Sequence, residues 1–270
     1  LVGSEMCIRD RAEPVSTESS SAGSATVSQP EEAEPAPEPE PQPLVQTVRF
    51  SATGDNLIHA PIYKQAKRRA AGTEGYSFDY CYEHIAPFYV QQDVNWINQE
   101  TLCTDELEPS SYPCFSTPGD CARALYRAGV RVFSLSNNHT YDKGASGIAA
   151  TLRFWGSMPE DVVTTGLWKG ESDYGHIPLQ TVNGVTIAYL SYTEHTNGIP
   201  QNSSMQANVI YTSQTDVIEQ QVKAARQLAD FVVVGVHWGV ENSHAIADPQ
   251  RALAPVSYTH LRAHETCADL

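Results

Sequence analysis

Four polar clusters in the sequence carry the kinds of side chain that bind divalent metal ions. They are "GDNLIH" (54–59), "NQE" (98–100), "NNHTYD" (137–142) and "HWGVE" (237–241). Carboxylate, imidazole and amide oxygen together suit Zn²⁺, Mn²⁺ or Fe²⁺, whereas oxygen ligands alone favour Mg²⁺ or Ca²⁺. Two ions held together would clamp a phosphoryl oxygen and generate hydroxide near neutral pH, provided that a carboxylate bridges them.

Each cluster also has an ordinary structural explanation. A Gly-Asp pair after a strand is most often a turn, a lone histidine is most often a structural residue, and "NQE" can cap a helix. The clusters therefore indicate a site only if the fold brings them together.

The elements that precede the clusters predict that they converge. Apolar runs predict strands, which we place at 45–53, 93–98, 130–136 and 231–236. A polar cluster follows each of these strands, and open α/β sheets bind ligands outside the carboxyl ends of their strands. We predict helices around 80–92, 116–129, 145–155 and 215–230, so the alternation favours an α/β fold with largely parallel buried strands.

Two local signals refine this prediction. In the second helix Thr117 is expected to cap, Pro118 to take the first helical position and Gly129 to end the helix. A hairpin over 176–192 is expected to turn at Asn183 and Gly184.

Composition excludes several classes of function. The formal charge is −15, and residues 12–46 hold seven Glu with no Lys or Arg, which argues against nucleic-acid binding. The sequence contains no GxSxG, GxxxxGK[ST], GxGxxG or HExxH motif, so serine hydrolase, phosphate-loop, Rossmann and zincin interpretations lack their residues. We interpret "KQAKRR" (64–69) as a solvated helix face and "SYTEHTNG" (191–198) as a polar turn.

The two ends differ in character from the rest of the chain. Residues 1–11 and 255–270 resemble translated sequencing-adapter read-through, and we exclude them from fold reasoning. The Pro, Glu and Ser-rich segment 12–46 is typical of a disordered tether. Such tethers commonly separate a membrane anchor or signal peptide from an exported domain, so we expect an extracellular or cell-surface location.

Cysteines give no unique prediction. Outside the two ends the chain has Cys81, Cys103, Cys114 and Cys121, which suit one or two disulfides or buried free thiols equally well. None has the paired spacing of a zinc site.

The four clusters, in this order and spacing, resemble the motifs of the CapA family of capsule-synthesis proteins. The resemblance covers residues 47–254 and implies a four-layer α/β/β/α fold of the calcineurin-like metallophosphatase type. It implies two divalent ions (Mn, Zn or Fe), with Asp55 on the first, Glu100 as the bridge, and Asn138 and His237 on the second. His59 is a further candidate metal ligand, although it lies four residues after Asp55, whereas the superfamily usually has a histidine two residues after the aspartate.

The resemblance also implies catalytic residues. His139 would lie beside the scissile bond, oriented by Asp142, and Glu241 of the "HWGVE" block joins this set. The family continues to a Gly-His-x-x-His type block that this sequence lacks, so we expect a chain truncated inside its metal site.

The implied function is that of a metal-dependent hydrolase of a phosphoester or of an amide bond in poly-γ-glutamate. The alternative is a non-catalytic accessory protein that binds or exports the anionic capsule polymer with the same pocket. Turnover with added metal distinguishes the two.

Overall fold

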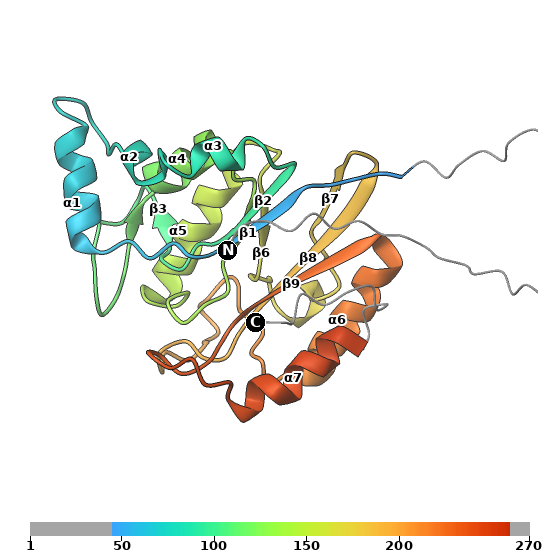
Figure 1. The fold of residues 1–270 in the computed structure, drawn as a ribbon. Helices are drawn as coiled ribbons and strands as arrows, with labels where there is room; N and C mark the ends of the chain where they lie inside the picture. The colour runs from blue at the N-terminus through green and yellow to red at the C-terminus, as the bar shows by residue number, and fades with distance from the viewer. Residues whose placement is uncertain (1–44, 260–270) are drawn as a thin grey trace, which may run out of the picture. The chain divides into compact units, whose positions relative to one another are not determined.

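The structure is a computed structural model that describes residues 45–259, with side chains as far as residue 255 (Figure 1). Its strands form two main sheets and a small third one. The first sheet has the order β1-β2-β5-β6 and is entirely parallel. Its strands are β1 (Phe50–Asp55), β2 (Val94–Asn98), β5 (Val132–Ser134) and β6 (Val163–Thr165).

The second sheet has the order β7-β8-β9, with an antiparallel β7–β8 pair and a parallel β8–β9 pair. Its strands are β7 (Leu179–Val182), β8 (Val185–Thr193) and β9 (Phe231–His237). The third sheet pairs β3 (Cys103–Thr104) with β4 (Thr117–Pro118). Asn183 and Gly184 both have positive φ, which confirms the predicted hairpin turn.

Helices cover the outer face of each main sheet, as Figure 1 shows. Over the first sheet lie α1 (Ala60–Arg69), α2 (Asp79–Tyr82), α3 (Ala86–Tyr89), α4 (Asp120–Ala128) and α5 (Gly144–Gly156). Over the second lie α6 (Thr215–Leu228) and α7 (Asp248–Thr259), while a 3₁₀ turn, η1 (Glu171–Asp173), precedes β7.

Strand β8 shows why the fold has four layers. Val185, Ile187 and Tyr189 pack against the first sheet, where they meet Val94 and Val132. The alternate residues, Ala188, Leu190 and Tyr192, pack against α6 and α7. Because side chains alternate along a strand, β8 is buried on both faces. The predicted α/β/β/α order of layers is confirmed.

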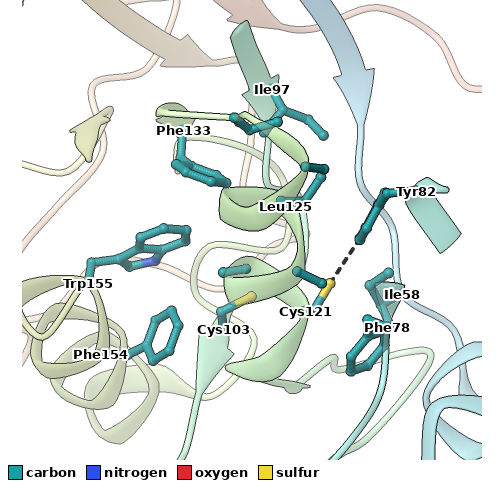
Figure 2. Close-up of a cluster of buried hydrophobic side chains, with 14 of the residues drawn as sticks. Ile58, Phe78, Tyr82, Ile97, Cys103, Cys121, Leu125, Phe133, Phe154 and Trp155 are labelled. Atoms are coloured by element: carbon teal, nitrogen blue, oxygen red, sulfur yellow. Dashed lines mark hydrogen bonds between the residues drawn. The ribbon is translucent and has the colours of Figure 1, made fainter. Parts of the chain in front are cut away.

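The core on the first sheet's outer side gathers side chains from five helices and three strands, β2, β3 and β5. Figure 2 shows Ile97 and Phe133 of the sheet facing Leu125, with Phe154 and Trp155 beside them. This packing holds the helices that follow β1, β2 and β5, and thereby the loops between them.

Three local predictions were wrong. Helix α4 begins at Asp120 with Gly119 before it, so Thr117 does not cap it and Pro118 is not its first residue. Both residues instead form β4, where the Thr117 amide donates to Leu102. The helix predicted at 80–92 is two short helices, α2 and α3. Gly129 does end α4, with φ of 112°.

The chain ends lie mostly outside the described residues. Residues 12–44 of the expected tether and most of the adapter-like ends fall there, while residues 45 and 46 are described and α7 continues past residue 254 to Thr259. All four cysteines described are free thiols, with Cys103 and Cys121 buried. Within residues 45–259, no helix has the length and apolar character needed to cross a membrane.

Candidate functional site

The ends of three strands from both main sheets meet at one edge. Asp55, Asn98 and His237 are the last residues of β1, β2 and β9. The Asn98 Nδ2 donates to Asp55 Oδ1 at 2.6 Å and lies 3.2 Å from His237 Nδ1. An irregular register between Thr53 and Asp55 places Asp55 opposite Asn98. The structure therefore brings together side chains that are far apart in sequence.

Glu100 lies between two imidazoles. Its Oε1 is 3.9 Å from His237 Nε2 and 4.0 Å from His139 Nε2, and its side chain is 8% exposed. Burial, followed by the negative charge of Asp55, raises the pKa of the Glu100 carboxyl. Glu100 is thus a buried acid in contact range of both histidines.

Asp55 and His237 form an ion pair that shifts the pKa of each partner. The contact with His237, 3.6 Å between Asp55 Oδ1 and His237 Nδ1, lowers the pKa of Asp55. The hydrogen bond from Asn98 lowers it further, whereas partial burial acts in the opposite direction. Burial alone would lower the pKa of His237, but Asp55 and Glu100 outweigh it and raise that pKa. The charges of Asp55, Glu100 and His237 therefore influence one another's protonation at the ends of β1, β2 and β9.

His139 is oriented by Asp142 in the turn that follows β5. Its Nδ1 lies 2.8 Å from Asp142 Oδ2, and that same oxygen accepts a hydrogen bond from the Phe115 amide at 2.6 Å. An ionised carboxylate only accepts, so the Nδ1 of His139 carries the proton and Nε2 faces Glu100. The predicted pair thus has the geometry of an imidazole held in one tautomer.

Phe115 separates His59 from this pair. The Phe115 ring packs edge-on against His139 (4.7 Å between centroids) and against His59 (5.0 Å). His59 is exposed and lies directly before α1, at its N-cap, and its Nδ1 lies 3.4 Å from Ser111 Oγ. The four-residue spacing after Asp55 carries His59 to the start of α1, so the structure does not bring it into contact with the candidate ligands.

Glu241 is also placed apart from the cluster. It is exposed in the turn after β9, and within residues 45–255 it makes no hydrogen bond or ion pair. Glu194, which follows β8, instead accepts a hydrogen bond from the Gly239 amide at 2.8 Å and so holds this turn.

Sequence reasoning missed Asn197. Its Oδ1 accepts from Asn138 Nδ2 at 3.5 Å, and its Nδ2 lies 3.3 Å from His139 Nδ1. Asn197 has φ of 52°, a left-handed conformation that costs energy in most residues and recurs at functional sites. The Asn-Gly pair at 197–198 was the available signal, but it equally marks a turn.

The donor set fits a divalent ion in chemistry. Buried oxygens of Asn98, Asn138 and Asp142 have no hydrogen-bond partner, which costs about 1–3 kcal/mol each unless something else binds them. In the part of the chain that the structure describes, however, no group of three or more His, Cys, Asp or Glu is arranged to hold a metal. Any ion would therefore need the amide oxygens or a small movement of Asp55, Glu100 and His237.

The fold and the site together define a class of protein: a two-sheet α/β/β/α sandwich with carboxylate, imidazole and amide groups gathered at its strand ends. Residues 49–258 match the family model described as "Bacterial capsule synthesis protein PGA_cap". The match covers well over half of the chain, and the chain belongs to this family.

Two curated relatives are similar to the chain. It is 30% identical over 195 residues to a capsule biosynthesis protein CapA of Bacillus anthracis, an alignment that covers 66% of this chain and 45% of the relative. It is 26% identical over 185 residues to the PGA biosynthesis protein CapA of Bacillus subtilis strain 168, covering 67% and 48%. The chain spans about half the length of these relatives.

One solved structure with a similar arrangement is described as a 5′-nucleotidase of Staphylococcus aureus. The TM-score is 0.42 with 15% identity, over 72% of this chain and 38% of that one.

Proposed function

We propose that this domain is a metal-dependent hydrolase in capsule biosynthesis and that it cleaves a phosphoester or an amide bond of poly-γ-glutamate. The observation that carries the proposal is the buried His139–Asp142 pair with Nε2 directed at Glu100, beside the ends of β1, β2 and β9. Beside this pair, Asp55 and His237 shift one another's pKa and burial raises the pKa of Glu100, and groups with perturbed pKa values are concentrated at functional sites.

The proposed ligands of the ions are Asp55, Glu100, Asn138 and His237. Two of them are carboxylates, one is an imidazole, and the Asn138 Oδ1 is a buried oxygen without a partner. Mn²⁺, Zn²⁺ or Fe²⁺ bound here would polarise the substrate oxygen and lower the pKa of bound water.

The chain's own residues would handle the proton. His139, once protonated at Nε2, can donate to the leaving group, and Asp142 keeps the opposite nitrogen protonated throughout. Phe115 packs on the ring and limits its rotation, so that Nε2 stays on the Glu100 side.

Turnover by the purified product of the complete gene tests the proposal. We expect release of 4-nitrophenol from a 4-nitrophenyl phosphoester, or of shorter fragments from poly-γ-glutamate, with Mn²⁺ or Zn²⁺ added. EDTA should abolish either reaction. Saturable polymer binding with no product under any metal would instead make this an accessory protein.

We further propose that the domain acts outside the membrane, on an anionic polymer or phosphoester. The support is the composition of residues 12–46, which is typical of a tether, together with the capsule family of residues 49–258. Added protease should remove the domain from intact cells while a cytoplasmic marker survives. Protection of the domain until the cells are lysed would contradict this location.

A further inference from the structure

Three buried amide side chains lie beneath the candidate site. Asn56, Gln99 and Asn137 are 9%, 2% and 1% exposed, and each is the sequence neighbour of a proposed ligand. We propose that Gln99, together with Asn56 and Asn137, is a positioning residue that fixes the ligands of three different strands relative to one another. This inference rests on the proposed function, because that function defines which ligands are positioned.

The first link joins the end of β1 to the end of β2. Asn56 Nδ2 donates to Gln99 Oε1 at 2.7 Å, and the backbone N–H of Asn56 donates to the Asn98 carbonyl at 2.8 Å. Asp55 precedes Asn56, and Glu100 follows Gln99. The separation of the two carboxylates is thus set by a pair of hydrogen bonds outside the sheet ladder.

The second link joins the end of β2 to the turn after β5. Asn137 Nδ2 donates to the Gln99 carbonyl at 3.0 Å, and Asn137 Oδ1 accepts from the His139 amide at 3.0 Å. The backbone N–H of Gln99 donates in turn to the Ser134 carbonyl at 2.9 Å. Asn137 therefore ties the backbone of His139 to that of the segment carrying Glu100.

Gln99 also shapes its own turn, since its Nε2 donates to the Thr101 carbonyl at 2.8 Å. Beyond Asn56 the network ends in the apolar core. Asn56 Oδ1 accepts from the Tyr82 hydroxyl at 2.9 Å, and that hydroxyl lies 3.1 Å from Cys121 Sγ. Figure 2 marks the contact between Tyr82 and Cys121 with a dashed line. Anchoring at α2 and α4 leaves the amides with little freedom to move.

Proposed ligands and buried amide residues are adjacent in sequence at each strand end, and this pattern distinguishes a positioning role from stabilisation alone. At each of the three strand ends a proposed ligand faces the site while the adjacent amide is buried and hydrogen-bonded. Outer partners of this kind typically change metal affinity or activity by about 10- to 100-fold when they are removed. A buried amide elsewhere should contribute only to stability.

Gln221 of α6 provides that comparison. It is 3% exposed, its Oε1 accepts from the Tyr192 hydroxyl at 3.0 Å, and its Nε2 donates to the Tyr174 carbonyl at 2.7 Å. Gln99 likewise accepts from one side chain and donates to one backbone carbonyl, with a longer bond to the Thr101 hydroxyl at 3.3 Å. The two glutamines are matched in burial and bonding but differ in location, since Gln221 belongs to the core between α6 and the second sheet.

Gln99→Met and Gln221→Met in the complete gene product test the proposal. Both should lower the Tm of the metal-free protein, because each leaves buried partners unpaired. Only Gln99→Met should weaken Mn²⁺ binding in a calorimetric titration, by about 10- to 100-fold, and lower kcat with it. Equal Mn²⁺ affinity and kcat in the two variants would overturn the positioning role.

Amide hydrogen exchange of the metal-free protein keeps the test independent of the proposed function. Gln99→Met should speed exchange at the Asn56 amide, while Gln221→Met should leave it unchanged. If the wild type neither binds Mn²⁺ nor turns over substrate, the proposed function fails, and this exchange result still decides the inference. If Gln99→Met does not fold, Asn137→Leu replaces it, with faster exchange expected at the His139 amide. Unchanged exchange would reject the network.

Discussion

Asp142→Asn is expected to lower kcat by about 10²- to 10⁴-fold, the range for impairing a general acid or base. The Phe115 amide and His139 Nδ1 both contact Oδ2, so an asparagine oxygen in that position can accept from both but carries no negative charge. His139 should therefore keep its tautomer and lose the carboxylate that stabilises its protonated form.

Two measurements check this outcome. Steady-state kinetics gives kcat, and the ¹⁵N shifts of the His139 ring report which nitrogen carries the proton. Asp230→Asn serves as the control, because Asp230 also accepts a backbone N–H, that of Thr186 at 2.8 Å, but is exposed and lies at the opposite ends of the strands. Wild-type kcat in Asp142→Asn would remove Asp142 from the mechanism.

His139→Ala is expected to lower kcat by about 10²- to 10⁴-fold, as for the loss of a general acid or base, while bound metal stays nearly unchanged. Bound metal should be retained because His139 is not a proposed ligand: its Nδ1 contacts Asp142, and its Nε2 lies 4.0 Å from Glu100. Metal content by mass spectrometry and kcat should therefore separate. His84→Ala, at an exposed histidine beside Glu83, is the control.

The double variant sharpens the assignment. Residues that act as one unit show strongly non-additive effects, so Asp142→Asn should cost little more once His139 is alanine. Loss of metal in His139→Ala would reassign this histidine as a ligand. Additive losses in the double variant would mean that Asp142 acts on something other than His139.

Elements with strong local signals could be predicted from the sequence. Asn183-Gly184 supplies the positive φ values that a tight hairpin requires, and the apolar runs before Asp55, Asn98 and His237 identify the strands that end in them. Because parallel strands of one sheet present their carboxyl ends at one edge, topology accounts for the convergence of Asp55 and Asn98, whereas His237 comes from the second sheet.

Contacts made by irregular segments could not be predicted in this way. The loop between β3 and β4 brings Phe115 onto His139, yet it has neither helical nor strand periodicity. Asn197 reaches Asn138 from the loop after β8, where the pattern indicates only a turn. Thr117-Pro118 carried a strong helix-start signal, but pairing with β3 prevailed, since tertiary contacts override local preference.

The division of the site between two sheets has a consequence for the order of assembly. All four strands of the first sheet lie between residues 50 and 165, whereas those of the second lie between 179 and 237. During synthesis the first sheet can therefore leave the ribosome complete, with Asp55, Glu100 and His139 already in place. His237 arrives last and from the other sheet, so the polar centre closes only when the two sheets dock. A spectroscopic probe on His237 would thus report the docking of the second sheet onto a first sheet that is already formed.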